Sequence, residues 1–420
     1  MKFSILLLLI LPTTASLFAA EPTSTAATAS NALGVDLLHK TARPDANALI
    51  SPYSIQSALA MTYAGADGAT REEMMAVLHY PTNDTELHHS FTTLQKELDG
   101  IMQRSAEAAE EMKRYGATND PITLTVANRL FGQQGYEFRS AFLSLVKENY
   151  GAPLEPMDFR KDAAGATKHI NDWVEQQTRQ RIRNLIPDGA LSRITRLVLV
   201  NAIYLKAPWA EKFHEEATKR QPFHIDGGAT VNVPTIMEQQ KLSYAKRDGF
   251  SVVVIPYSDW NIQFVILLPD KTNGLAALEN KLNPGLLAQC ANLPSREIIL
   301  YLPKFKLEPP MIPLSKQLQE LGMKTAFDKP QGSANFDRMA PRRLDDYLYI
   351  SEVFHKTFLN LDENGTEATA ATAVMMDDAT GIPSPKPKPI EVHVDHPFIF
   401  AIQHRPSGAC LFLGRVTDPR

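Results

Sequence analysis

A run of small residues near the C-terminus constrains this chain more than any other feature. Residues 366–376 have the sequence TEATAATAVMM and follow the turn signal Asp362-Glu363-Asn364-Gly365. In an extended run, alternate side chains lie on opposite faces. The face that begins at Thr366 has no charge and little bulk in its early positions, so it can enter a sheet over a packed core. The run suits a segment that is exposed in one state and inserted in another, although its composition equally allows a helix or a linker.

Apolar patterns along the rest of the chain favour an α+β fold. Ser51 and Pro52 provide the N-cap and first turn of a helix. A second helix is expected between Ile170 and Ile182, where apolar residues recur with helical spacing. Strands are expected at short apolar, β-branched runs, namely residues 197–205, 252–256, 264–268, 298–305, 398–402 and 410–416. Helices therefore dominate the first half and strands the second, which favours α+β over a doubly wound sheet.

The N-terminus has the pattern of a secretory signal peptide. Met1-Lys2 precedes the apolar run Ile5 to Leu11, and small residues follow up to Ala20. The apolar run is far shorter than the roughly 20 residues of a membrane span. We therefore expect a signal peptide at residues 1–20, a flexible leader at 21–30 and, since no linker or repeat divides the rest, a single domain at 31–420. The expected location is secreted or periplasmic, with no membrane span.

Charge and motif content exclude several classes of function. The net charge is −4 with both signs interspersed, so no basic stripe predicts a nucleic-acid partner. Cys290 and Cys410 are too few for a disulfide framework, which leaves both a pair and buried free thiols open. His393, Asp395 and His396 give no clear ligand geometry, so no metal or cofactor is expected. No nucleophile elbow, zinc-protease motif, phosphate loop or dinucleotide fingerprint occurs, and we expect no enzyme.

The hinge-like stretch from Glu363 to Ala373, ENGTEATAATA, resembles the hinge signature of the serpin family of serine protease inhibitors. Other segments resemble that family in the same order along the chain, namely residues 47–65, 197–206 with Trp209, 302–305 and 396–416. Each match alone is weak, but their shared order is specific and covers nearly all of the mature chain.

The resemblance implies a fold and a mechanism. The fold would be that of a serpin, with helices packed around a large central β-sheet, smaller sheets and an exposed reactive-centre loop. A serine protease would cut this loop and form a covalent acyl-enzyme, and the cut loop would insert into the main sheet and trap it, as serpin loops do. The protein is expected to act as a monomer. The alternative is a non-inhibitory serpin that acts as a carrier or chaperone.

The resemblance also implies roles for individual residues. The hinge comprises Glu363, Gly365, Thr366, Ala368, Ala370 and Thr372. A buried polar cluster at the opening point of the sheet comprises Ser51, Ser54, Asn201 and His355. Trp209 and Lys304 lie near the loop's entry point with Glu363, and a surface Glu–Lys pair there is expected to have a modest effect.

The reactive bond follows from spacing in the family. The bond lies fourteen residues beyond the hinge glycine, which places it between Ala379 and Thr380. Alanine suits a protease with a small apolar pocket, of the elastase or subtilisin kind. The stretch from Ala379 to Pro397 is longer than in many serpins, so Met376 is a second candidate.

Overall fold

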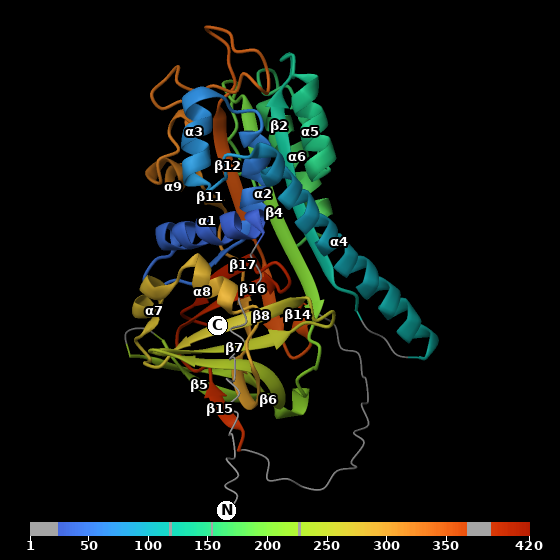
Figure 1. The fold of residues 1–420 in the computed structure, drawn as a ribbon, viewed down its shortest axis with the longest axis vertical. Helices are drawn as coiled ribbons and strands as arrows, with labels where there is room; N and C mark the ends of the chain where they lie inside the picture. Colours follow the sequence, from blue (N-terminus) through green and yellow to red (C-terminus); the bar gives the residue numbers. More distant parts are fainter. Residues whose placement is uncertain (1–23, 117–119, 153, 226–227, 368–387) are drawn as a thin grey trace, which may run out of the picture.

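The computed structural model describes residues 24–116, 120–152, 154–225, 228–367 and 388–420, and the predicted signal peptide lies outside these ranges. Figure 1 shows an elongated molecule in which helices surround one long sheet in the upper half, while most strands of a second sheet lie in the lower half. The described α-helices are α1 (Thr25–Thr41), α2 (Pro52–Tyr63), α3 (Gly68–Val77), α4 (Asp84–Arg114), α5 (Ser140–Tyr150), α6 (Ala163–Gln177), α7 (Leu275–Lys281), α8 (Pro284–Gln289) and α9 (Ser315–Glu320).

The long sheet is built around one buried strand. It contains β2 (Thr123–Gln133), β3 (Glu155–Met157), β4 (Leu197–Pro208), β10 (Phe305–Leu307), β11 (Ile312–Pro313), β12 (Ile350–Thr357), β13 (Leu359–Asp362) and β14 (Gly365–Thr366). Strand β4 pairs antiparallel with β2 on one side and parallel with β12 on the other. Only Lys206 of its residues is not buried, as expected for a continuous apolar run covered on both faces.

The second sheet holds most of the later strands. In spatial order it contains β1 (Ala48–Ile50), β17 (Ala409–Val416), β16 (Phe398–His404), β8 (Ile262–Pro269), β7 (Phe250–Pro256), β6 (Thr230–Arg247), β9 (Ser295–Pro303) and β15 (Ile390–His393), and β5 (Lys219–His224) pairs with β6. The strand runs predicted from the sequence lie within strands of these two sheets, except that the run 298–305 extends from β9 past Lys304 into the first residue of β10. The predicted α+β class is confirmed.

Helix α2 joins the two sheets and carries part of the functional site. All of its residues are buried, since it packs against β4 and β2 of the long sheet and against β17 of the other. The Ser51 hydroxyl accepts a hydrogen bond from the Ser54 amide at 3.2 Å, which is the predicted N-cap, and Pro52 occupies the first turn. This cap fixes the side chains of Ser51 and Ser54 where α2 packs against the long sheet.

The leader predicted for residues 21–30 is wrong from residue 25 onward. Helix α1 begins at Thr25, and the Ser24 side chain accepts a hydrogen bond from the Ala27 amide. Ala26, Ala27 and Ala29 are buried within the core. Small residues look like a flexible segment in the sequence, but their size also lets a helix approach its neighbours closely, and that is their use here.

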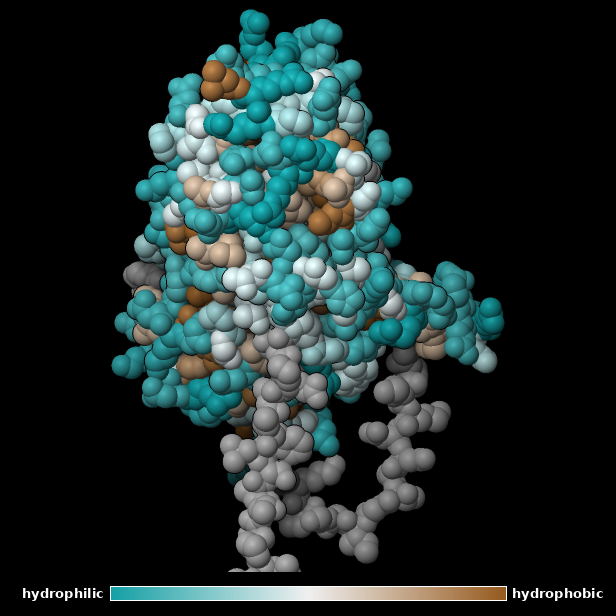
Figure 2. Space-filling model, turned by 45° about the horizontal axis from the view of Figure 1, so that its top comes forward, coloured by the Kyte–Doolittle hydropathy of each residue, from teal (hydrophilic) through white to brown (hydrophobic). Residues whose placement is uncertain are grey.

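The described residues contain neither a membrane-spanning helix nor a disulfide. None of the described helices has the length and apolarity that crossing a bilayer requires. Cys290 and Cys410 are both buried free thiols. On the face shown in Figure 2, hydrophilic side chains dominate and apolar ones form small separate groups, so this face presents no broad apolar surface.

Candidate functional site

A buried polar cluster lies where α2 meets β4 and β12. The Asn201 amide on β4 donates hydrogen bonds to the Ser54 hydroxyl at 2.5 Å and to Asn128 Oδ1 at 2.6 Å. The His355 imidazole on β12 bonds to Asn201 Oδ1 through Nδ1 and accepts from the Ser51 amide through Nε2 at 3.1 Å. The structure thus brings together all four predicted members of the sheet-opening cluster. Within this cluster, the side-chain hydrogen bond between His355 and Asn201 joins β12 to β4, in addition to their parallel backbone pairing.

The hydrogen bonds of His355 define its protonation. The Ser51 amide can only donate, so Nε2 is the acceptor and Nδ1 carries the proton that Asn201 Oδ1 accepts. Both ring nitrogens are therefore satisfied in the neutral imidazole. Complete burial lowers the pKa of His355 to about 3, and no carboxylate in the cluster opposes this shift.

Asn128 belongs to this cluster but was not predicted. Its amide donates to the Ser54 carbonyl oxygen at 2.9 Å, and its Oδ1 accepts from both Ser54 and Asn201. The sequence does contain a signal that could have identified Asn128. On strand β2, Asn128 shares the face of the buried Leu124 and Leu130. A polar residue in an apolar stripe requires a buried hydrogen-bond partner.

The predicted hinge begins inside the long sheet. Strand β14 pairs antiparallel with β4, through Gly365 with Pro208 and Thr366 with Ala207, and antiparallel with β13 on its other side. Gly365 has a φ of 143°, and a Cβ there would lie 2.1 Å from the Ala207 carbonyl oxygen. Only glycine fits this close approach, which gives the hinge glycine a physical reason.

Two aromatic rings support the inserted end of the hinge. The Trp209 indole stacks on Tyr257 with ring centroids 4.6 Å apart, and its Nε1 donates to the Asp362 carbonyl oxygen at 3.0 Å. The Tyr257 hydroxyl lies 2.6 Å from the Thr366 hydroxyl, and both side chains are fully buried. Trp209 thus contacts the chain just before β14, and Tyr257 is an additional contact that sequence patterns missed.

The Glu363 carboxylate is a buried anion and not a surface group. Lys304 Nζ lies 2.7 Å from its Oε2, and the Thr218 hydroxyl donates to Oε1 at 2.7 Å. Burial alone would raise the pKa of Glu363, but these hydrogen bonds outweigh it and the pKa is lowered. The Glu363 side chain is 7% exposed, so this is not the surface pair that the sequence suggested. Loss of Lys304 would leave a buried charge with fewer partners, and its cost should exceed the modest effect expected of a surface pair.

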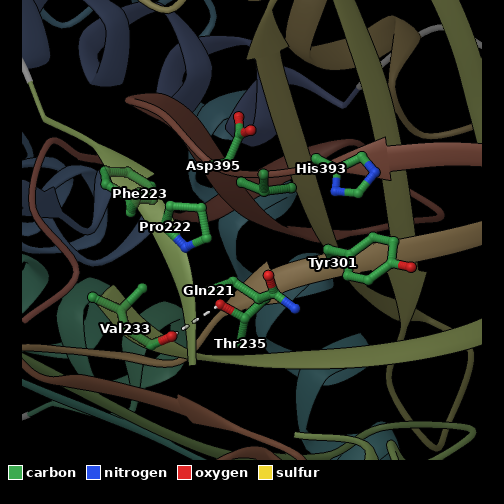
Figure 3. Close-up of a pocket in the computed structure, with 9 residues that line it drawn as sticks. Gln221, Pro222, Phe223, Val233, Thr235, Tyr301, His393 and Asp395 are labelled. Atoms are coloured by element: carbon green, nitrogen blue, oxygen red, sulfur yellow. Dashed lines mark hydrogen bonds between the residues drawn. The ribbon is translucent and has the colours of Figure 1, made fainter. Parts of the chain in front are cut away.

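Strand β15 lies beside a small hollow in the second sheet. Figure 3 shows this hollow between Gln221 and Phe223 of β5, Tyr301 of β9 and the strand that carries His393. The His393 ring stacks on Tyr301 with centroids 4.2 Å apart, and His396 bonds to Asp395 at 2.7 Å. These histidines thus have packing and hydrogen-bonding partners, and no metal-holding group of His, Cys, Asp or Glu occurs among the residues that the structure describes.

Several predicted residues lie outside the described ranges. They are the hinge residues Ala368, Ala370 and Thr372, the reactive-bond residues Ala379 and Thr380, and the second bait candidate, Met376.

Sequence comparison identifies relatives over nearly the whole chain. The family profile described as "Serpin (serine protease inhibitor)" matches residues 28–419. The leukocyte elastase inhibitor of Bos taurus is 37% identical over 385 residues, which cover 90% of this chain and 94% of that protein. An uncharacterized serpin-like protein of Thermococcus kodakarensis is 35% identical over 93% of this chain and 85% of its own length.

Solved structures of serpins share the fold. Serpin48 of the insect Tenebrio molitor, described as a highly specific serpin, matches with a TM-score of 0.76 and 31% identity over 94% of this chain and 97% of that one. The thermophilic serpin tengpin in its native state matches with a TM-score of 0.78 and 27% identity over 94% of each chain. The fold predicted from the resemblance is confirmed.

The relatives overturn the predicted secreted or periplasmic location. The proteins matched at 37% and 35% identity in Bos taurus and Equus caballus are leukocyte elastase inhibitors, and the family match begins only at residue 28. Neither the relatives nor the family match supports the location that residues 1–20 predict.

The expectation of no enzyme is also corrected, because missing motifs do not decide whether a chain is an enzyme. The finding that bears on it is that the relatives are named as inhibitors of a protease. Taken with the family match and the shared fold, the relatives show that this chain belongs to the serpin family.

Proposed function

We propose that this chain inhibits a serine protease as a suicide substrate, with the bond between Ala379 and Thr380 as bait. The protease serine oxygen attacks the Ala379 carbonyl carbon, the peptide bond breaks, and the Thr380 amine leaves with the proton that the serine gave up. An ester then joins the protease to residue 379. Entry of the cut loop into the long sheet carries the protease away before water hydrolyses that ester.

The observation that carries this proposal is the double pairing of β14. Gly365 and Thr366 already lie between β4 and β13, with backbone partners on both sides. Further entry along the same line would separate β4 from β12, which are now parallel neighbours. One parallel ladder would be lost and two antiparallel ladders gained. A net gain of about ten hydrogen bonds at roughly 0.5–1.5 kcal/mol each is on the order of 10 kcal/mol, comparable to the stability of a whole domain.

The polar cluster fits a role in controlling this separation. The His355–Asn201 hydrogen bond joins β12 to β4, and insertion has to break or rearrange it. Ser51, Ser54 and Asn128 hold Asn201 and His355 from the α2 and β2 side. A satisfied polar cluster at a seam can part and re-form with defined geometry, whereas interlocked apolar side chains resist such separation.

The bait residue and the relatives support one class of target. Alanine at position 379 fits a small apolar pocket, and the bovine and equine relatives are named leukocyte elastase inhibitors. We therefore propose an elastase-like or subtilisin-like protease as the partner.

Incubation with a panel of serine proteases tests the proposal. A complex that survives boiling in SDS is expected with an elastase-like or subtilisin-like enzyme, and mass spectrometry of the released C-terminal peptide should show Thr380 as its first residue. A peptide that begins at Asp377 would move the bait to Met376. Cleavage of the loop by every protease without any stable complex would contradict inhibition and favour the carrier or chaperone alternative.

Ala379→Arg is the matched specificity variant. It should transfer complex formation to trypsin-like enzymes while leaving the hinge and the polar cluster unchanged. An unaltered protease preference would show that residue 379 does not fill the primary pocket.

A further inference from the structure

Glu367 is the first residue after the paired hinge strand β14. Thr366 is still paired on both sides, but Glu367 has a φ of 53°, a left-handed conformation that is unfavourable for a residue with a Cβ. Its amide donates to the Asn360 carbonyl oxygen at 2.9 Å. A strand residue needs extended backbone, so Glu367 must change conformation before the next residue can enter the sheet.

The Glu367 side chain is held in this position by two groups. Its carboxylate forms an ion pair with Arg181 Nε and is hydrogen-bonded to the Tyr204 hydroxyl. The side chain is only 10% exposed, so this charge is largely out of water. Its second oxygen, Oε2, is buried and has no hydrogen-bond partner among the described residues. The carboxylate is thus held firmly enough to be ordered but is incompletely satisfied, which favours release.

Arg181, Tyr204 and Glu367 lie where the neighbour of β4 in the sheet changes from β12 to β14. Pairing of β4 with β12 ends at Ile203 and Thr357, and pairing of β4 with β14 begins at Ala207. Tyr204 is the next residue on β4 after the last β12 pair. The Arg181 guanidinium lies 5.9 Å from the centre of the Phe358 ring, which directly follows β12. The cluster therefore includes a residue of β4 and lies beside the residue that follows β12.

The position of Arg181 is set by the turn that ends α6. Its amide donates to the Thr178 carbonyl oxygen at 3.0 Å, and the Gln180 amide donates to the Glu175 carbonyl oxygen at 2.8 Å. Two nearby cations already have other carboxylates, Lys206 with Asp120 at 2.9 Å and Lys306 with Glu308 at 3.1 Å. Arg181 is thus the cation that the fold places on Glu367.

From this geometry we propose that Arg181, Tyr204 and Glu367 form a latch that stops the hinge after Thr366 and sets how fast the rest of the loop enters. The proposal rests on the proposed inhibitory function and adds positioning residues to it. The latch keeps Glu367 in its left-handed conformation and the two strands together. Once the loop is cut, insertion proceeds at the rate at which the ion pair opens. A weaker latch gives faster insertion.

The rate of insertion after loop cleavage tests the latch. Intact protein is mixed with a protease that cuts the loop, and tryptophan fluorescence is followed by stopped flow, because Trp209 lies beside the inserted hinge. Glu367→Gln and Arg181→Gln should each accelerate insertion by about fivefold, the effect of losing about 1 kcal/mol from the closed state. The double variant with Arg181→Glu and Glu367→Arg, which restores an ion pair, should return toward the wild-type rate.

Arg183→Gln is the matched control, because Arg183 lies two residues away and pairs with Glu175 at 3.2 Å. It should leave the insertion rate unchanged. If the wild type traps protease but the Glu367 and Arg181 variants insert within twofold of its rate, or more slowly, the latch is overturned and the inhibitory function stands. If neither wild type nor variants insert after cleavage, the proposed function fails and the latch with it.

Discussion

At the scale of single residues, His355 makes the seam of the long sheet sensitive to acid. Burial lowers its pKa from 6.5 to about 3. Between these values the unfolded chain binds a proton that the folded chain does not, so the contribution of His355 to stability is complete above about pH 6.5 and falls as the pH drops toward 3. Lowering the pH from 7.5 to 5.5 should therefore remove about 1 kcal/mol of the free energy of unfolding through this residue alone.

Urea unfolding of the wild type and His355→Gln at both pH values measures this effect. The variant is expected to be less stable at pH 7.5 but to lose less on acidification. His88 and His404 are also buried with pKa values lowered to about 4, so they contribute equally in both proteins and cancel in the comparison. Equal losses in the two proteins would show that His355 does not titrate on unfolding in this range.

The residues of the site divide by what a sequence pattern can reveal. The predicted cluster members and Trp209 lie in motifs that resemble a family, so their positions carried over directly. Tyr257 and Thr218 contact hinge residues more than a hundred positions away, at Thr366 and Glu363. A pattern shows which face of a strand a side chain lies on, but not which residue lies opposite it across the fold, and these partners were therefore missed.

At the scale of secondary-structure elements, the short strand β14 is the part on which inhibition should depend. Thr366 is fully buried against the Tyr257 hydroxyl, so Thr366→Arg would place an unpaired charge in a closed site at a cost of several kcal/mol. The hinge should leave the sheet, insertion should slow, and the protein should be cleaved as a substrate. The number of inhibitor molecules consumed per protease trapped measures this. An unchanged stoichiometry would contradict the assignment of Thr366 as the first inward-facing residue of the inserting strand.

Element types were easier to predict than element ends. The apolar run predicted at 197–205 forms β4, because a strand buried on both faces has an unmistakable composition. The helix predicted from Ile170 to Ile182 instead ends at Gln177, where Arg179 and Gln180 adopt positive φ without a glycine. Packing of Ile182 into the core imposes that turn, and no local stop signal announces it.

At the scale of the whole molecule, the long sheet is incomplete in a defined sense. Strands β4 and β13 already hold the hinge residues Gly365 and Thr366 between them, and β4 and β12 close the line along which later residues would follow. If the proposed insertion mechanism holds, this form has a lower-energy arrangement that the uncut loop prevents. Cutting the loop removes the restraint, so the fold as a whole should become more stable without any change in sequence.

Thermal melting of intact and loop-cleaved protein tests this stored stability. Insertion worth on the order of 10 kcal/mol, in a domain of this size with an unfolding entropy near 2.1 cal/mol/K per residue, should raise the Tm by roughly 10 °C or more. Thr366→Arg supplies the control, because the same cut in a hinge that cannot enter the sheet should leave the Tm nearly unchanged. A rise in both proteins would attribute the gain to the cut itself. No rise in either would mean that the intact fold stores no stability in its loop, and that inhibition by insertion has no driving force.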